Sequence, residues 1–208
     1  MKKWTIAKDF EYLGIENVKR IANKEPSKIR EPIIGLWITG CRASEYVALH
    51  TGMFQWLEDG YGREYLNVTR APLRKQRKKV LMYKDGEPWF NDKGQRIFKL
   101  MPDRNATRNF AIFRDDPFIK EFTNILDELG EDERLFPFNR KTLWKYTMLA
   151  NIRPHQLRAE RAMYFVTKKN MGIPFLKKWF GWSTSMMPEW YINLTSVDLV
   201  NMMYRGVL

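Results

Sequence analysis

Four short segments of this chain carry residue types that together could act on a phosphate group. Arg42 follows the pair Thr39-Gly40, while Arg158 and Tyr191 come far downstream. Two guanidinium groups can hold phosphate oxygens bidentately, and a tyrosine hydroxyl can attack phosphorus when a proton acceptor is near. If the fold brings them together, these side chains could break and rejoin a phosphodiester bond of DNA without a metal.

His155 and Arg158 are three residues apart in a segment that Pro154 is expected to open as a helix, so they should share one face. Small and apolar residues continue that face, which indicates that it points inward. A buried arginine is costly unless an anion or a partner compensates its charge. The alternative to a site is therefore a His and an Arg satisfied by a neighbouring carboxylate, such as Glu160 or Glu45.

The other residues also have ordinary structural explanations when each is taken alone. Arg42 could be a surface arginine at the start of a helix, and Trp182 could simply belong to the core. Tyr191 could be a half-buried core residue, as many tyrosines are. The order and spacing of the four segments are therefore more informative than any one of them.

Taken in order, these segments resemble the motifs of the tyrosine recombinase (phage integrase) family. Residues 39–45 (TGCRASE) match the family pattern Thr-Gly-x-Arg-x-x-Glu, and residues 155–158 (HQLR) match its second arginine motif. Residues 181–183 (GWS) match the third motif, where family members carry His or Trp. Tyr191 falls where the nucleophile is expected, and the resemblance spans about residues 12–195.

Two segments depart from the usual family pattern. Ala159-Glu160 follows the second arginine, where a His-Thr or similar pair is common. Residues 186–188 (MMP) precede Tyr191 in a run that often holds threonines. Neither segment supplies one of the primary catalytic positions.

The resemblance implies that six residues act at one site: Arg42, Glu45, His155, Arg158, Trp182 and Tyr191. The two arginines would stabilise the charge that develops on the phosphate, and the indole N–H would donate a further hydrogen bond. His155 would assist proton transfer, and Glu45 would support the network. Attack by Tyr191 would leave a 3′-phosphotyrosine and a free 5′-hydroxyl, so that rejoining needs no ATP, metal or cofactor.

The family also uses a lysine on a β-hairpin as general acid for the leaving 5′-oxygen. Residues 70–79 (RAPLRKQRKK) follow the first arginine motif at about the right distance, and Lys75 is the first candidate, with Lys78 and Lys79 as alternatives. A different alignment would place the hairpin turn near residues 104–108, with Lys99 as the nearest lysine. The basic run is also expected to contact DNA phosphates. The residues predicted to do so are Arg70, Arg74, Arg77, Lys78 and Lys79.

The elements that must position this set are mostly helical. Helical periodicity, caps and glycine stops predict helices over residues 14–24, 33–49 with a turn at Gly40, 115–130, 139–152, 154–169 and 173–180. Pro26 and Pro32 are expected to bracket a connection. Strand-forming residues over 64–100 and 109–113 predict a small sheet. We expect an α+β fold that is mainly α: a helical tyrosine-recombinase catalytic domain with a small antiparallel β-sheet on one side.

The composition indicates a polyanionic partner. The chain has 36 Lys and Arg against 24 Asp and Glu, a net charge of +12, which suits DNA or an anionic membrane surface, although it could serve solubility alone. One cysteine and two histidines leave no plausible zinc cluster. No apolar run approaches the length of a membrane span, and no signal peptide is evident. We therefore expect an intracellular protein, in the cytoplasm or nucleoid of its host cell.

The ends of the chain suggest how it is organised. Residues 1–208 are predicted to form a single catalytic domain with an opening helix at about 12–24, and the usual N-terminal core-binding domain is expected to be absent. The tail, residues 192–208, is apolar. The resemblance implies that it docks on a neighbouring protomer in a tetramer on synapsed DNA, with a monomer possible in solution. Docking on its own core is the alternative.

These observations lead to one main hypothesis and two alternatives. The main hypothesis is a site-specific recombinase, the integrase of a virus, plasmid or other mobile element, acting on a double-stranded DNA attachment site. One alternative is a topoisomerase-like enzyme that nicks and closes DNA with the same residues. The other is a non-catalytic basic DNA-binding protein.

Overall fold

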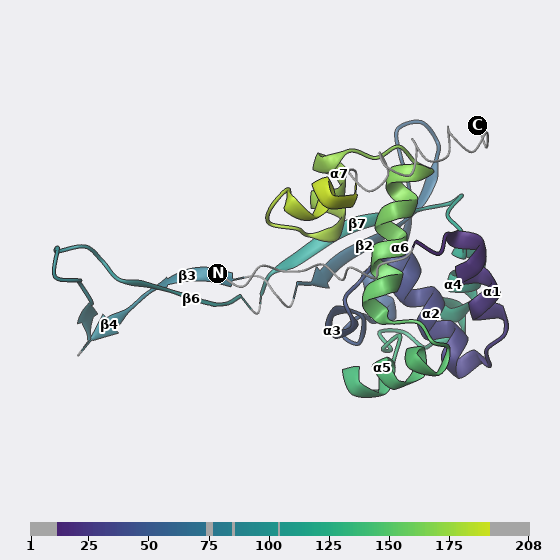
Figure 1. Ribbon diagram of the computed structural model, residues 1–208, viewed down its shortest axis with the longest axis horizontal. Coiled ribbons are helices and arrows are strands. Elements are labelled where there is room, and N and C mark those ends of the chain that lie inside the picture. The colour runs from purple at the N-terminus through teal and green to yellow at the C-terminus, as the bar shows by residue number, and fades with distance from the viewer. Residues whose placement is uncertain (1–11, 74–76, 85, 104, 192–208) are drawn as a thin grey trace.

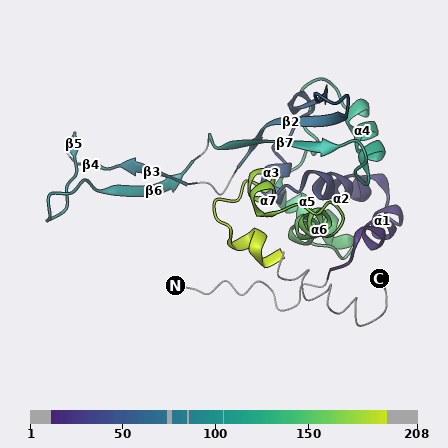
Figure 2. The same cartoon turned by 90° about the horizontal axis from the view of Figure 1, so that it is seen from above.

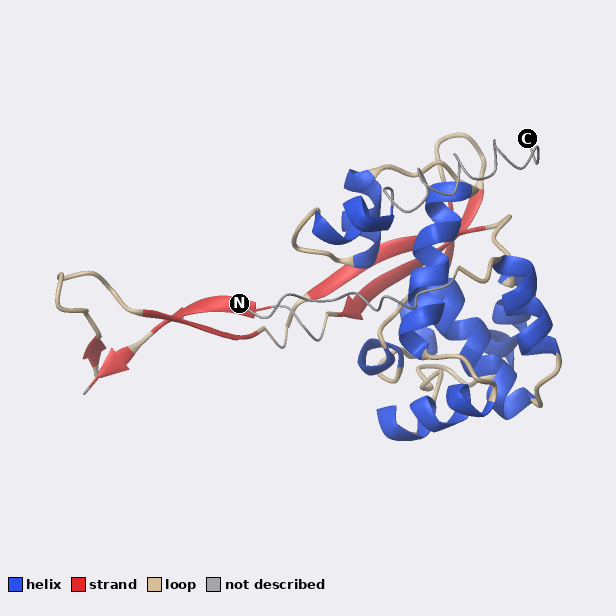
Figure 3. Ribbon diagram, in the orientation of Figure 1, coloured by secondary structure: helices blue, strands red, loops and turns tan. Residues whose placement is uncertain are grey.

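The computed structural model describes residues 12–73, 77–84, 86–103 and 105–191. Its helices pack into one body, and a small antiparallel sheet covers one side of that body (Figures 1 and 3). This arrangement confirms the predicted α+β fold. In chain order the helices are α1 (Ile15–Asn23), α2 (Ser27–Thr39), α3 (Ala43–Tyr46), α4 (Ile119–Glu128), α5 (Arg140–Leu149), α6 (Pro154–Thr167) and α7 (Ile173–Phe180).

Helix α2 lies at the centre of the helical body. Nine of its thirteen residues are buried, and it packs against α1, α4, α5 and α6. The prediction that Pro26 and Pro32 bracket a connection is wrong, because the helix begins at Ser27 and Pro32 lies inside it. A proline at this place removes one backbone hydrogen bond of the helix. Burial of apolar side chains on every side of α2 offsets that loss.

Three antiparallel strands form the sheet in the order β1-β2-β7. They are β1 (Phe54–Glu58), β2 (Glu64–Pro72) and β7 (Thr107–Phe113). Leu66 pairs with Ile112 and Val68 with Phe110, and all four side chains are buried. The register between β2 and β7 shifts between Val68 and Ala71. The predicted strand over 109–113 is therefore confirmed, and it begins two residues earlier.

Between β2 and β7 the chain runs out into a long projection, which we call the β-arm (residues 77–103; Figures 1 and 2). Its strands are β3 (Arg77–Leu81), β4 (Tyr83–Lys84), β5 (Glu87–Pro88) and β6 (Phe98–Pro102). Strand β3 pairs antiparallel with β6, and β4 pairs with β5. The alternative hairpin turn near residues 104–108 is wrong. Ala106, Thr107 and Arg108 are instead bonded to or paired with residues 71–73 at the base of the arm.

The helix ends show where local signals hold and where tertiary contacts override them. Asn139 caps α5 by accepting hydrogen bonds from two backbone N–H groups, in agreement with the helix start predicted at residue 139, and α6 and α7 begin where expected. Helix α4 begins only at Ile119, after Phe118 in a left-handed conformation. Asp116, which lies near the predicted start of this helix, does not cap it. It accepts a hydrogen bond from the Phe113 backbone and pairs with the buried Arg161.

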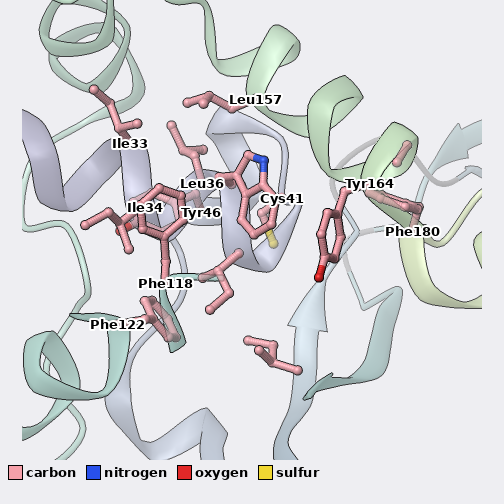
Figure 4. Packing of buried hydrophobic residues seen from close by; sticks show 14 of the residues in the cluster. Ile33, Ile34, Leu36, Cys41, Tyr46, Phe118, Phe122, Leu157, Tyr164 and Phe180 are labelled. Carbon is pink, nitrogen blue, oxygen red and sulfur yellow. The ribbon is translucent and has the colours of Figure 1, made fainter. Parts of the chain in front are cut away.

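A continuous cluster of apolar side chains joins the helices to the sheet (Figure 4). Trp37 of α2 is fully buried and packs edge-on against Phe118 and Tyr164, with ring centroids 5.5 and 5.3 Å apart. Arg161 is also fully buried, and its guanidinium lies over the rings of several core aromatics, Trp37 among them. The core therefore already holds one paired arginine, and the candidate site lies at its edge.

Candidate active site

The site is built on the turn between α2 and α3. Gly40 ends α2 in a left-handed conformation, with φ of 55°, as predicted. A Cβ at this position would lie 2.6 Å from the side chain of Trp179 and 2.7 Å from that of Phe180. Only glycine satisfies both the backbone angle and the close approach of α7. The turn places Arg42 at the N-terminal cap of α3.

Arg42 and Glu45 hold each other across the first turn of α3. The Nη1 atom of Arg42 lies 2.6 Å from Oε1 of Glu45, and the Arg42 backbone N–H donates to Oε2 at 3.0 Å. Glu45 is fully buried, whereas 18% of the Arg42 side chain is exposed. Burial by itself raises the pKa of Glu45, but Arg158, Arg42 and Arg108 together hold that pKa below its ordinary value. Glu45 is therefore ionised at neutral pH, and Arg42 has access to solvent.

Arg158 reaches the same carboxylate from α6. Its Nη1 atom lies 3.6 Å from Oε2 of Glu45 and also donates to the carbonyl of Gly40, while Nη2 donates to the carbonyl of Phe180 at 2.9 Å. Burial, with the positive charges of Arg108 and Arg42, lowers its pKa to about 9, although Glu45 opposes this shift. Arg158 thus stays charged at neutral pH. The sequence suggested Glu160 or Glu45 as a carboxylate that could compensate this arginine. The partner in the structure is Glu45.

Tyr191 enters the site through a stack of aromatic rings. The ring of Phe180 stacks on Trp182 with centroids 4.5 Å apart, and Trp182 stacks on Tyr191 at 5.6 Å. The guanidinium of Arg158 lies 4.9 Å from the Phe180 ring and 5.5 Å from that of Trp182. Burial raises the pKa of Tyr191 to about 12, although Arg158 lowers it. The phenol is therefore protonated at neutral pH and needs a proton acceptor before it can attack.

Sequence reasoning missed a third arginine at this place. Arg108 is buried at the start of β7 and donates to the carbonyls of Trp179 and Thr39, the latter at 3.4 Å, and to the Cys41 sulfur at 3.3 Å. The signal was present, because residues 108, 110 and 112 alternate with exposed or partly exposed ones along the predicted strand. An arginine in line with two buried apolar residues must have a partner inside the fold.

Arg108 and Arg158 bridge the same two helix ends. One connects the carbonyls of Thr39 and Trp179, and the other connects those of the next residues, Gly40 and Phe180. Carbonyls at the C-terminal end of a helix have no partner within the helix and carry partial negative charge. The two guanidiniums therefore fix the end of α2, which leads to Arg42, against the end of α7, which leads to Trp182.

His155 does not follow its prediction. It is exposed on the first turn of α6, whereas Arg158 is 3% exposed, so the expectation that both point inward is wrong. Residues three apart on a helix differ by about 60° in direction. The boundary between the buried and exposed faces of α6 passes between these two side chains. A role for His155 in proton transfer stays a prediction.

The basic run after β2 is only partly within the described residues. Lys75, the predicted general acid, and Arg74 lie outside them, as does the side chain of Arg77. Arg70 is exposed at the shift of register in β2, and Lys78 and Lys79 are exposed on β3. Leu73, the last described residue of the run before Lys75, lies close to Gly181, since a Cβ on that glycine would approach its side chain to 2.6 Å. The structure thus brings the end of β2 to the turn that carries Trp182.

Among the described residues no group of three or more His, Cys, Asp or Glu is placed to hold a metal ion. None of the helices described is both long enough and apolar enough to cross a bilayer.

The fold is similar to that of one solved recombinase, and a second solved protein gives a weaker match. The crystal structure of XerA recombinase matches with a TM-score of 0.53 and 16% identity, over 94% of this chain and 65% of that one. The structure of a lambda integrase dimer bound to a COC′ core site matches with a TM-score of 0.48 and 14% identity, over 88% of this chain and 47% of that one. This chain therefore spans less than two thirds of the length of either protein. No protein-family model matches the sequence, and no curated protein matches it.

Proposed function

We propose that the protein cleaves and rejoins DNA at specific sites, with Tyr191 as nucleophile. The observation that carries this proposal is the charge balance at the α2–α3 turn. The guanidiniums of Arg42, Arg158 and Arg108 all lower the pKa of one carboxylate, that of Glu45. A buried cluster with more positive than negative charges is stabilised by binding an anion. A phosphodiester is an anion of the right geometry for two of these groups.

Each step of the proposed reaction is assigned to one or two residues. The partly exposed Arg42 meets the phosphate first, and Arg158 completes the clamp. The Tyr191 oxygen bonds to phosphorus as the bond to the 5′-oxygen breaks, and the indole N–H of Trp182 donates to the phosphate. His155 assists transfer of the phenol proton, and Lys75 protonates the leaving 5′-oxygen. The reverse reaction rejoins the strand, because the phosphotyrosine link keeps the bond energy.

The substrate has to open the site before it can react. Tyr191 and Arg158 are 4% and 3% exposed. A phosphate that displaces the Trp182–Tyr191 stack would exchange burial of the phenol for charge-assisted hydrogen bonds to Arg158. Lys177 and Lys178 line a surface hollow beside Trp182. Their positive charge would attract the DNA backbone to this edge of the site.

The proposed biological setting is integration by a mobile element such as a virus or plasmid. The substrate would be a duplex attachment site, and a tetramer would assemble on two synapsed sites. The tail, residues 192–208, would connect its protomers, and this segment lies outside the described residues. The whole chain is proposed to act as one catalytic domain.

The test is covalent trapping on DNA without a metal. A pool of nicked duplexes with randomised sequence is incubated with the protein in EDTA, and adducts are separated under denaturing conditions. We expect an adduct with the wild type and with Tyr61→Phe, an exposed control, but none with Tyr191→Phe. An adduct that persists in Tyr191→Phe would overturn the nucleophile.

The same experiment distinguishes the alternatives. No adduct with the wild type would favour a non-catalytic DNA-binding protein. Relaxation of supercoiled DNA without recombinant products from paired sites, once these are selected from the pool, would favour a topoisomerase-like enzyme. Arg42→Lys and Arg158→Lys should each reduce adduct formation at least ~100-fold, because lysine cannot make bidentate contacts. Arg30→Lys, exposed on α2, should not.

A further inference from the structure

Packing within the described part of the protein does not explain why the β-arm is so long. Strands β3 and β6 pair over five residues each, and the tip continues through β4 and β5. Figures 1 and 2 show the arm extending away from the helical body in both views. A two-stranded ribbon by itself is at best marginally stable in water. A partner that covers the arm would account for it.

The arm exposes aromatic side chains. Tyr83, Trp89, Phe90 and Phe98 are 60%, 42%, 49% and 53% exposed. The described part of the chain has eight exposed aromatic residues, and four of them lie on this short segment, residues 77–103. Exposed apolar surface of this extent marks a contact surface rather than a folded interior.

The charge of the arm and its base indicates which kind of partner it meets. Residues 70–103 carry ten basic and four acidic residues, a net charge of +6, which is half of the +12 of the whole chain. Lys84, Lys93 and Arg96 are exposed near the tip, and Lys78 and Lys79 are exposed nearer the base. Because Lys78 and Lys79 are neighbours on one strand, they point to opposite faces of the ribbon. Both faces of the ribbon formed by β3 and β6 therefore carry positive charge.

We propose that the β-arm binds duplex DNA beside the phosphodiester that is cleaved, as a second contact region. This inference rests on the proposed function, which supplies DNA as the substrate. A two-stranded ribbon fits the major groove of DNA. The base of the arm adjoins Leu73, which lies against Gly181 next to Trp182. DNA held at Arg42 would thus continue along the arm, and not toward α1 on the other side of the body (Figure 1).

The two kinds of side chain would have different tasks on the DNA. Lys84, Lys93 and Arg96 would neutralise backbone phosphates, which adds affinity without sequence preference. Trp89 and Phe90 would pack on deoxyribose rings or thymine methyl groups at the wall of the groove. The arm would increase the time spent on DNA without changing the chemical step at Tyr191.

The test compares two triple variants that remove the same charge. Lys84→Ala/Lys93→Ala/Arg96→Ala changes the arm, and Lys24→Ala/Lys28→Ala/Arg30→Ala removes three exposed charges from the opposite side of the body. Dissociation constants are measured on 12-bp and 40-bp duplexes of random sequence at several salt concentrations. We expect the arm variant to weaken binding to the 40-bp duplex about 10-fold or more, and to reduce the salt slope by about 2.7, for three lost phosphate contacts. The control variant should change neither, and the arm effect should be smaller on the 12-bp duplex.

A second variant, Trp89→Ala/Phe90→Ala, tests the aromatic part. It should weaken binding to the 40-bp duplex several-fold while leaving the salt slope as in the wild type. Equal effects of the arm and control triples, or no effect of either arm variant, would overturn the proposal. Unchanged DNA affinity with lost self-association in sedimentation would also overturn it, and would assign the arm to a second copy of the chain.

Failure of this inference is distinct from failure of the proposed function. If Tyr191 forms no adduct but the arm variant still loses affinity and salt slope, the arm binds DNA in a protein that does not cleave it. If adducts form and the arm variants bind as the wild type does, the chemistry stands and the arm has another partner.

Discussion

The α2–α3 turn and the β-arm both carry basic side chains, but those at the turn are mostly buried and those on the arm are exposed. At the turn Arg158 and Arg108 are buried, their N–H groups bonded to backbone carbonyls and, for Arg158, near one carboxylate. On the arm Lys84, Lys93 and Arg96 are exposed. A buried guanidinium must be held in one geometry, which suits a phosphate clamp. An exposed one costs little and can adapt, which suits DNA of any sequence. The same substitution should therefore have a large effect at the turn and a small one on the arm.

The largest difference should follow removal of a carboxylate. Glu45→Gln leaves Arg158 buried without its counter-charge and should lower the free energy of unfolding by about 3–5 kcal/mol. Asp103→Asn on the arm removes a partner 3.8 Å from Lys78 and should cost less than about 1 kcal/mol. Urea unfolding followed by circular dichroism measures both. Similar losses in the two variants would mean that Glu45 does not hold the arginines together.

Alanine variants of two glycines with positive φ distinguish the cost of the side-chain contact at the turn from the cost of the unfavourable backbone angle. Gly40→Ala should destabilise the fold by about 3 kcal/mol, because the new Cβ meets Trp179 and Phe180 and also adopts an unfavourable φ. Gly94 on the arm has φ of 69° and nothing within 4 Å of a Cβ, so Gly94→Ala should cost only about 1 kcal/mol. Thermal unfolding measures the difference. If the two values agree, the close approach of α7 has no energetic weight.

Glu160, on the same helix as Arg158, should make stability depend on pH. Burial raises the pKa of Glu160 to about 7, although hydrogen bonds from the Leu13 and Gly14 backbones lower it. Between about pH 4.5 and 7 the folded state then binds more protons than the unfolded state. The free energy of unfolding should therefore decrease as the pH rises through this window and level off above it. The loss should be about 2–3 kcal/mol.

The variant Glu160→Gln should remove most of that pH dependence, whereas the exposed arm variant Glu87→Gln should keep the wild-type curve. Unfolding free energies measured from pH 5 to 8 test this. A wild-type slope that persists in Glu160→Gln would assign the pH dependence to another group.

Arg108→Met tests the bridge between the helix ends. It leaves the Trp179 and Thr39 carbonyls without this donor and should cost about 1–2 kcal/mol. It should also slow adduct formation at saturating DNA, because the Arg42 turn is less well fixed against Trp182. Lys120→Met, exposed on α4, should alter neither quantity. Stability lost without any slower cleavage would make Arg108 purely structural.

The smallest expected effect is on the arm itself. Trp89→Ala/Phe90→Ala should change the free energy of unfolding by no more than about 0.5 kcal/mol, since both side chains are exposed. Differential scanning calorimetry of the free protein measures this. A loss of several kcal/mol would show that these side chains pack on the body of the free protein in solution and are not available to a partner.

Local signals predicted much of the framework. The cap at Asn139, the proline that opens α6 and the glycines that end α2 and α7 act through their own backbone, so their positions could be read directly. The strand over 109–113 followed from its alternation. The grouping of Arg42, Arg158 and Tyr191 came from the order of the motifs, and the structure places their elements around Glu45 and the stack on Trp182.

Long-range contacts decided the rest. Pro32 lies within α2, and Asp116 pairs with Arg161 instead of capping α4, because tertiary burial outweighs local preference. The exposure of His155 depends on where the buried face of α6 ends. The sequence by itself determined which residues are available for phosphate chemistry and which turns carry them. Only the tertiary structure decided that one carboxylate would balance several arginines, since that balance is set by residues that are distant along the chain and adjacent in the fold.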